Sequence, residues 1–266
     1  MRLTGVLLAA LLIFGVLSIL WCDGVPLWGD ASLKTCGLGR LFASDSPSDT
    51  TAISTVAAVD SAAAAPAAPA AARPAQPDTT AKTILFVGDS MLDGLRPRMA
   101  AYAEHNGHKL YGVRWYSSTT QVWGSSQRLA GFIKQYKPDY VIVCLGANEL
   151  FVRDIKEKRQ RYLDEMLRQI GSLPMVWIGP PNWKADTGIN EMLEATLPRG
   201  TFYLSKNDKF ERGKDGAHPT RESAAQWCDR VCRWIVAESA HPIRLDLPKK
   251  KYANSTKTDI LQPNEK

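Results

Sequence analysis

Three short polar motifs contain the residue types that serine-dependent acyl chemistry requires. They are Gly88-Asp89-Ser90, Gly146-Ala147-Asn148-Glu149 and Asp215-Gly216-Ala217-His218-Pro219. A serine hydroxyl becomes a nucleophile when an imidazole accepts its proton and a carboxylate orients that imidazole. His218 follows Asp215 by three residues, so one tight loop can bring the carboxylate to one ring nitrogen and leave the other for Ser90. Asn148 can donate an amide N–H to a developing oxyanion.

The sequence around these motifs alternates apolar, strand-like runs with longer amphipathic runs. Predicted strands cover 83–87, 109–116, 140–145, 175–178 and 202–204. One predicted helix follows Gly88 and runs through 99–104, and further predicted helices cover 126–136, 156–170 and 221–236. This alternation with short links predicts an α/β protein, a three-layer α/β/α sandwich with a mostly parallel sheet. Reactive groups collect at the carboxyl ends of the strands in such sheets, so we expect the three motifs to meet there. Ser90 starts a helix, whose N-terminus favours negative charge.

Each motif alone has an ordinary structural explanation. Gly-Asp-Ser is a common turn, Asn148 can cap a helix, and Asp215 can be a solvated loop residue. The chain has four histidines, and the other three lie in a polar connection or near the C-terminus, at His105, His108 and His241. The three motifs occur together and in order, each beside a predicted element, and this combination indicates a catalytic site.

The region 82–236 resembles the SGNH, or GDSL, hydrolases, because the three motifs are similar to that family's Gly-Asp-Ser, Gly-x-Asn-Asp and Asp-x-x-His blocks. The resemblance implies a flavodoxin-like fold and hydrolysis or transfer of acyl groups on oxygen esters. It makes Ser90 the nucleophile, His218 the base and Asp215 the residue that orients the base. The backbone N–H of Ser90 and the side chain of Asn148 would line the oxyanion hole.

Two positions depart from the family pattern. Thr119 stands where the family usually has a glycine after the second strand, and its backbone N–H can still serve as an oxyanion donor. The β-branched Thr119 side chain would crowd the acyl group, which suggests a small acyl such as acetyl. Glu149 stands where the family commonly has aspartate, so we expect it to support the loop differently while Asn148 stays in place.

The N-terminal 81 residues differ in composition from the rest. Residues 3–21 are almost wholly apolar and long enough to span a bilayer. Arg2 precedes them and acidic residues follow, so domain 1–22 is predicted to be an uncleaved signal anchor at the cell membrane with the C-terminal bulk outside, in the periplasm of a Gram-negative cell. A cleaved signal peptide is the alternative. Residues 23–81 form an Ala/Pro-rich linker that we expect to be largely disordered.

We assign 82–240 to the catalytic domain and 241–266 to a polar C-terminal tail, which is expected to be disordered. The net charge is +6 with a sequence pI near 9.0. Acidic residues are interleaved with the basic ones and no basic stripe with aromatics occurs, so nucleic acid is not an expected partner. No Cys/His spacing resembles a zinc site, and neither a metal nor a cofactor is expected.

Three functions from different classes remain open. The first is an extracytoplasmic esterase that removes small acyl groups from an acylated glycan or a small ester. The second is an O-acyltransferase that passes the acyl group to a polysaccharide hydroxyl, with a membrane partner that delivers acyl groups. The third is a non-catalytic module that binds glycan. Trp183 follows the fourth predicted strand, where it can stack on a sugar ring or pack at the edge of the domain.

Overall fold

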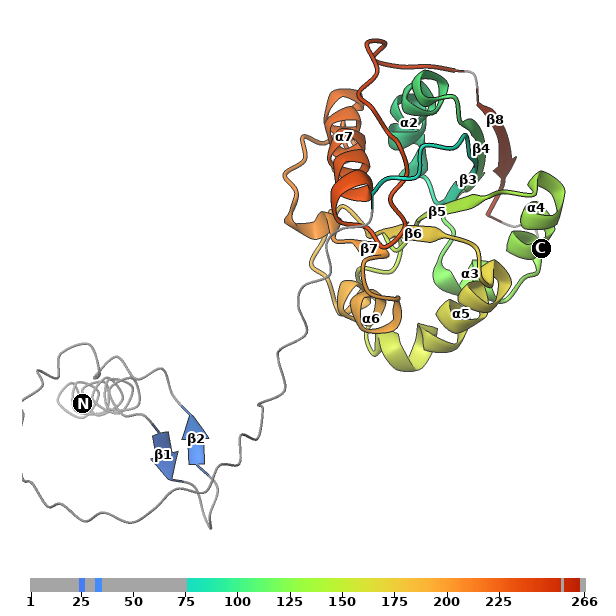
Figure 1. The fold of residues 1–266 in the computed structure, drawn as a ribbon. Helices are drawn as coiled ribbons and strands as arrows, with labels where there is room; N and C mark the ends of the chain where they lie inside the picture. The colour runs from blue at the N-terminus through green and yellow to red at the C-terminus, as the bar shows by residue number, and fades with distance from the viewer. Residues whose placement is uncertain (1–23, 27–31, 35–75, 255, 264–266) are drawn as a thin grey trace, which may run out of the picture. The chain divides into compact units, whose positions relative to one another are not determined.

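The computed structural model describes residues 24–26, 32–34, 76–254 and 256–263 (Figure 1). The chain divides into two units, Met1–Pro66 and Ala67–Lys266. In the first unit, the described residues form an antiparallel pair of β1 (Gly24–Pro26) and β2 (Ser32–Lys34). The predicted membrane segment 3–21 and most of the predicted linker lie outside the described residues. Within the described part of the chain, no helix is both long and apolar enough to cross a membrane.

The second unit is built on a six-stranded sheet whose strands follow the order β7-β6-β5-β3-β4-β8. The strands are β3 (Thr83–Gly88), β4 (Lys109–Trp115), β5 (Tyr140–Cys144), β6 (Met175–Ile178), β7 (Phe202–Tyr203) and β8 (Lys257–Leu261). Every neighbouring pair is parallel. All five residues of β5 are buried, as expected for a central strand with both faces covered. The predicted α/β fold with a parallel sheet is confirmed.

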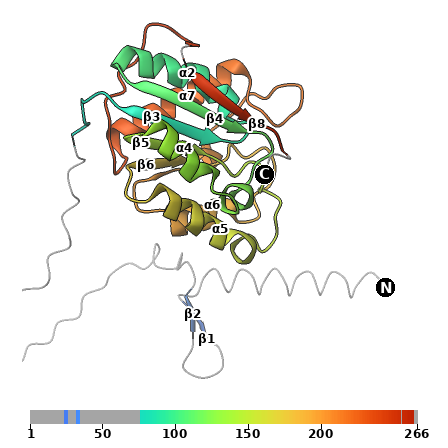
Figure 2. The ribbon, with the colours of Figure 1, turned by 90° about the vertical axis from the view of Figure 1, so that its right-hand side faces the viewer.

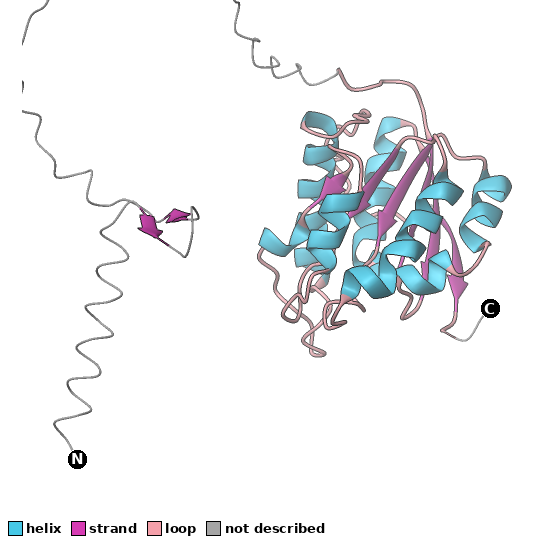
Figure 3. Ribbon diagram, turned by 90° about the horizontal axis from the view of Figure 1, so that it is seen from below, coloured by secondary structure: helices cyan, strands magenta, loops and turns pink. Residues whose placement is uncertain are grey.

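Helices cover both faces of this sheet (Figures 1 and 3). Alternate residues of β3 enter different cores, because successive side chains of a strand point to opposite faces. Ile84 and Phe86 pack in the core that includes the long helices α2 (Leu92–Asn106) and α7 (Arg221–Ala237). Leu85 and Val87 pack in the other core, which includes residues of four helices. These are α3 (Thr120–Gly124), α4 (Arg128–Tyr136), α5 (Ile155–Ile170) and α6 (Ile189–Thr196).

The segment after Pro242 is ordered and belongs to the folded unit, so the prediction of a disordered tail and of a domain boundary at residue 240 is wrong. Ile243, Leu245 and Ala253 are buried in the α2–α7 core. β8 then extends the sheet beside β4, as Figure 2 shows. The domain also starts before residue 82, since Asp78 forms an isolated bridge with Ile243. β8 could not be recognised in the sequence, because edge strands commonly carry charged and polar residues.

Two short helices, α3 and α6, were not predicted, whereas the helix predicted after Gly88 is α2, which begins at Leu92. The start of α2 matters for the site, because it lies close to the end of β3. Ser90 lies in the turn between these two elements.

Candidate active site

Ser90, His218 and Asp215 are joined by hydrogen bonds at the carboxyl end of the sheet. The Nε2 atom of His218 lies 2.8 Å from the Ser90 hydroxyl oxygen, and its Nδ1 atom lies 2.7 Å from Oδ2 of Asp215. Ser90 follows β3, while the other two residues lie in the loop before α7. The structure therefore brings together the three residues that the sequence separates by 128 positions.

The loop that carries His218 is held in shape by its own carboxylate. Oδ1 of Asp215 accepts hydrogen bonds from the backbone N–H groups of Ala217 and His218, while Oδ2 faces the imidazole. Gly216 lies between Asp215 and Ala217 and has φ 67°, a left-handed conformation that glycine adopts without strain. These hydrogen bonds lower the pKa of Asp215 to about 2, so its carboxylate is ionised at neutral pH. An ionised carboxylate at Nδ1 orients the ring and leaves Nε2 toward Ser90.

Arg212 connects this loop to the loop after β6. Its guanidinium donates hydrogen bonds to the carbonyl oxygens of Ala217, Pro181 and Asn182. The first of these carbonyls directly precedes His218, and the last directly precedes Trp183. The position of His218 is therefore coupled to the neighbouring strand end.

The turn that presents Ser90 depends on Gly88 and Asp89. A Cβ atom on Gly88 would overlap the carbonyl oxygen of Cys144 in β5, so only glycine permits this approach of the two strands. The Asp89 side chain is fully buried and accepts a hydrogen bond of 2.9 Å from the Met91 N–H. Burial, and to a smaller extent nearby Glu149, raises the pKa of Asp89 to about 7 against the opposing effect of the backbone hydrogen bonds of this turn.

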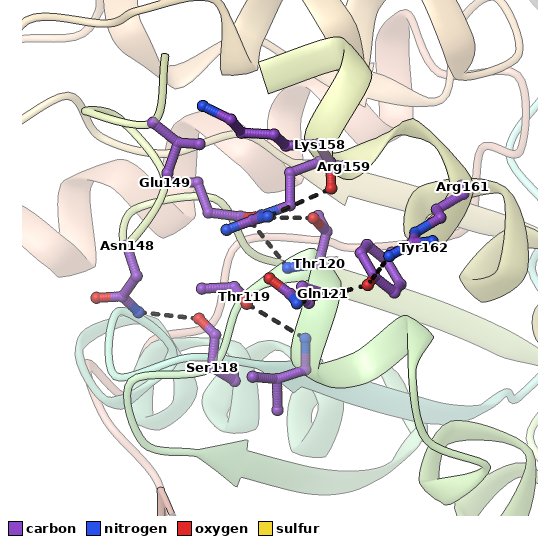
Figure 4. Close-up of polar contacts among 12 residues, drawn as sticks. Ser118, Thr119, Thr120, Gln121, Asn148, Glu149, Lys158, Arg159, Arg161 and Tyr162 are labelled. Carbon is purple, nitrogen blue, oxygen red and sulfur yellow. Dashed lines mark hydrogen bonds and ion pairs between the residues drawn. The ribbon is translucent and has the colours of Figure 1, made fainter. Parts of the chain in front are cut away.

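Asn148 connects the second motif to this turn and to the loop after β4. Its Nδ2 atom donates a hydrogen bond of 3.0 Å to the Ser118 carbonyl oxygen (Figure 4). The same atom lies 3.5 Å from Oδ2 of Asp89. Gly146 has φ 124°, which lets the chain turn sharply at the end of β5. The amide of Asn148 is thus placed at the same strand ends as Ser90.

Thr119 lies in the loop after β4 and begins α3. Its hydroxyl oxygen accepts a hydrogen bond from the Val122 N–H, so the side chain caps this helix. A cavity of about 590 Å³ lies beside Ser90 and His218, and Thr119 does not line it. The inference of a small acyl group from the bulk of Thr119 therefore has no support in the structure. The cavity is lined by Ser90, Met91, Asp93, Gly94, Pro97, Tyr116, Ser117, His218, Pro219 and Arg221.

Trp183 lies beside the second motif. Its indole N–H donates a hydrogen bond of 2.9 Å to the Ala147 carbonyl oxygen, one residue before Asn148. The ring is half-buried and meets the exposed ring of Phe151 edge-on, at 6.4 Å between centroids. Trp183 therefore supports the loop of Asn148, and it does not line the cavity beside Ser90.

One component of the site, a buried ion pair between Glu149 and Arg159, was not predicted. In the sequence, Glu149 stands out only as a departure from the family pattern. Arg159 does not stand out, because it lies in a helix of mixed charge where most basic residues face solvent. Within the described residues, no group of three or more His, Cys, Asp or Glu side chains can hold a metal ion.

No family model and no curated protein matches this sequence. Several solved structures are similar in fold. They include the psychrotrophic esterase EstA from Pseudoalteromonas sp. (20% identity, TM-score 0.43), TesA (17%, 0.46) and a lipolytic protein described as of the G-D-S-L family from Desulfitobacterium hafniense (17%, 0.42). Each match covers 57% of this chain and 96 to 98% of the other chain. Likeness at this level says nothing about the reaction, so the function must be inferred from the site itself.

Proposed function

We propose that this chain is a serine esterase of the SGNH type, with Ser90 as nucleophile, His218 as general base and Asp215 as the residue that orients His218. The observation that carries the proposal is the continuous pair of hydrogen bonds from Asp215 through His218 to Ser90. Distances of 2.7 and 2.8 Å are within the range that proton transfer to a general base requires.

In the proposed first step, Nε2 of His218 takes the Ser90 proton as Oγ attacks the ester carbonyl carbon. The carbonyl oxygen becomes an oxyanion, for which the backbone N–H groups of Ser90 and Thr119 and the Asn148 amide are the candidate donors. The tetrahedral intermediate then breaks its bond to the alcohol oxygen. Protonated His218 gives its proton to this leaving group, and an acyl-serine remains.

In the second step, a water molecule attacks the acyl-serine while His218 removes its proton. The second tetrahedral intermediate breaks its bond to Oγ of Ser90 and releases the carboxylic acid, and protonated His218 returns its proton to Ser90. His218 and Asp215 are partly open to solvent, with side-chain exposures of 42% and 53%. Water can therefore reach the acyl-enzyme without a rearrangement of the loop.

The substrate that we propose is an oxygen ester of a small acyl group, such as an acetyl group on a cell-envelope glycan. The cavity beside Ser90 is open, and its lining combines the hydroxyls of Tyr116 and Ser117 with the charges of Asp93 and Arg221. These hydroxyl and charged groups can form hydrogen bonds with a substrate that carries several hydroxyl groups. In the same proposal, the predicted N-terminal anchor places the enzyme at the outer side of the cell membrane.

The second candidate is an O-acyltransferase that uses the same acyl-serine. The exposure of His218 favours this candidate too, because an alcohol can approach Nε2 by the path that is open to water. Transfer to a polysaccharide hydroxyl would need a membrane partner that supplies acyl groups. A non-catalytic glycan-binding role has less support, since binding alone does not need the hydrogen-bonded Ser90–His218 pair.

The test is turnover of p-nitrophenyl acetate, butyrate and octanoate by the full chain, beside Ser90→Ala and His218→Ala. Matched controls are Ser125→Ala and His105→Ala, which change exposed residues of the same types. We expect turnover to be lost in the first two variants only, with acetate as the best substrate. Turnover that persists in Ser90→Ala would overturn the proposal. Acylated sugar formed when an oligosaccharide is added would identify the transferase instead.

A further inference from the structure

Glu149 has a buried carboxylate with three hydrogen-bond donors around it. Its side chain has no exposed surface. The Thr120 N–H, the Thr120 hydroxyl and Nε of Arg159 each lie 2.8 Å from a Glu149 oxygen (Figure 4). Burial raises the pKa of Glu149, whereas the Thr120 and Arg159 contacts oppose this rise. A buried charge needs such partners, because removal of one of them leaves the other uncompensated.

Two consecutive residues of the second motif hold the loop after β4. Asn148 donates to the carbonyl oxygen of Ser118, and Glu149 accepts from both polar groups of Thr120. Thr119 lies between these two anchored neighbours. Ser118 is fixed further by Trp123, whose indole N–H donates to the Ser118 hydroxyl at 3.0 Å. The Thr119 backbone and the Asn148 amide are thus held relative to each other.

Arg159 lies in α5, and its ion pair with Glu149 connects this helix to the loop after β4. Helices α3 and α5 pack so closely that a Cβ atom on Gly124 would overlap the backbone of Tyr162. Arg159 lies one turn before Tyr162, and its side chain is only 16% exposed. It therefore reaches Glu149 from a helix that is already fixed against α3. An aspartate at position 149 would be one methylene shorter and could not keep all three contacts from the same backbone position.

We propose that Glu149 and Arg159 are positioning residues, whose ion pair sets the geometry of the Asn148 and Thr119 oxyanion donors relative to Ser90. This inference rests on the proposed esterase function, because it assigns the ion pair to that reaction. Neither residue touches the substrate. They act through Thr120 and the Asn148 loop, and a displacement of the donors by about 1 Å is enough to lower kcat about 100-fold.

The test compares Glu149→Gln and the double variant Glu149→Gln/Arg159→Met with wild type in the full chain. Glu165→Gln is the matched control, because it breaks a partly exposed ion pair with Arg168 on the same helix. Active sites are counted with a fluorophosphonate that labels Ser90, and kcat and KM for p-nitrophenyl acetate are given per labelled site. We expect Glu149→Gln to lower kcat about 10- to 100-fold with KM changed less than about two-fold.

The double variant separates positioning from stability. It removes the uncompensated Arg159 charge, so we expect the melting temperature to recover while kcat stays low. Glu165→Gln is expected to keep the wild-type kcat. If Glu149→Gln lowers the melting temperature but keeps the wild-type kcat per labelled site, the ion pair only supports the fold and the inference is wrong.

A second readout needs no activity. Hydrogen–deuterium exchange of peptides that cover 116–124 and 145–150 reports directly whether the two loops are held. We expect faster exchange in both peptides of Glu149→Gln and no change in Glu165→Gln. Absence of Ser90-dependent turnover in wild type would overturn the proposed function, and exchange would then decide whether the ion pair holds the loops. Unchanged exchange in Glu149→Gln would overturn the inference whatever the activity.

Discussion

The Nε2 atom of His218 lies 2.8 Å from the Ser90 hydroxyl oxygen, and the loop that places it there is folded around the carboxylate of Asp215. Asp215 thus has two tasks, since one oxygen holds the loop backbone and the other faces the imidazole. A substitution at this position separates the two tasks.

For Asp215→Asn we expect kcat to fall roughly a thousand-fold or more, because an amide cannot fix the tautomer and charge of His218 as a carboxylate does. The amide oxygen can still accept from the Ala217 and His218 N–H groups, so the loop should keep its shape. Steady-state kinetics and a melting curve check this. An unchanged kcat would contradict the role of Asp215, and a large drop in melting temperature would show that the loop itself is lost.

For Asn148→Ala we expect kcat to fall by about 10²–10³, with a much smaller change in KM, because an oxyanion donor acts mainly in the transition state. Asn207→Ala, at an exposed position of the chain, is the matched control and should behave as wild type. A rise in KM alone would contradict the role of Asn148 as an oxyanion donor. It would indicate instead that the side chain only binds the ground state of the substrate.

The raised pKa of Asp89 predicts that the stability of the protein depends on pH. Its pKa rises from 3.8 to about 7 on folding, so the native state binds more protons than the unfolded state between these values. The free energy of unfolding should therefore fall as pH rises from about 4 to 7. Asp89→Asn removes the titration and should flatten this fall, while its amide oxygen can still accept from Met91. Urea denaturation at several pH values is the measurement, and parallel pH profiles for the two proteins would contradict the prediction.

Substitution by alanine should have opposite effects on stability at Gly124 and at Gly131. Gly124→Ala should destabilise the protein and separate α3 from α5, because the new methyl group overlaps the Tyr162 backbone. Gly131 lies in α4 with no other atom near its would-be Cβ, so Gly131→Ala should stabilise the protein by up to about 1 kcal/mol. Thermal unfolding of both variants tests the packing of α3 and α5. Equal effects on the melting temperature would show that this packing is wrong.

The C-terminal segment offers a second matched pair. Leu245 is 6% exposed and Leu247 is 67% exposed, although they are two residues apart. Leu245→Ala should lower the free energy of unfolding by about 2–5 kcal/mol, as for other buried leucines. Leu247→Ala should have little effect, because the side chain already contacts water. Chemical denaturation distinguishes the two variants. An unchanged free energy of unfolding in Leu245→Ala would mean that the segment does not pack on the core in solution.

The sequence was sufficient to predict the parallel sheet, because its inner strands are continuous apolar runs such as β5. It was also sufficient to identify Ser90, Asn148 and His218 as neighbours, since all three follow or precede elements that end at one edge of the sheet. Whether the three act in catalysis is still a proposal. The residues of each motif are close to one another in the sequence, so each motif can be recognised from a short stretch of it.

Contacts between distant segments could not be predicted in the same way. β8 has no apolar periodicity, because an edge strand needs to bury only one end and one face, and Leu261 alone is buried in it. The pairing of Glu149 with Arg159 depends on how the loop before α5 bends, and the sequence shows only one basic residue among many in that helix. The Thr119 side chain caps α3. This role could not be predicted, because α3 is too short to be recognised by periodicity.

The position of β8 has a consequence for biosynthesis. A ribosome makes this strand after the other five strands of the sheet, yet β4 pairs with it and leads directly into the loop that carries Thr119. While β8 is still inside the ribosome, one edge of the described sheet is unpaired and the buried side chain of Leu261 is missing. We therefore expect this unit to complete its fold only after β8 has left the ribosome, and a chain that is stalled or terminated before β8 to present an open sheet edge to chaperones and proteases.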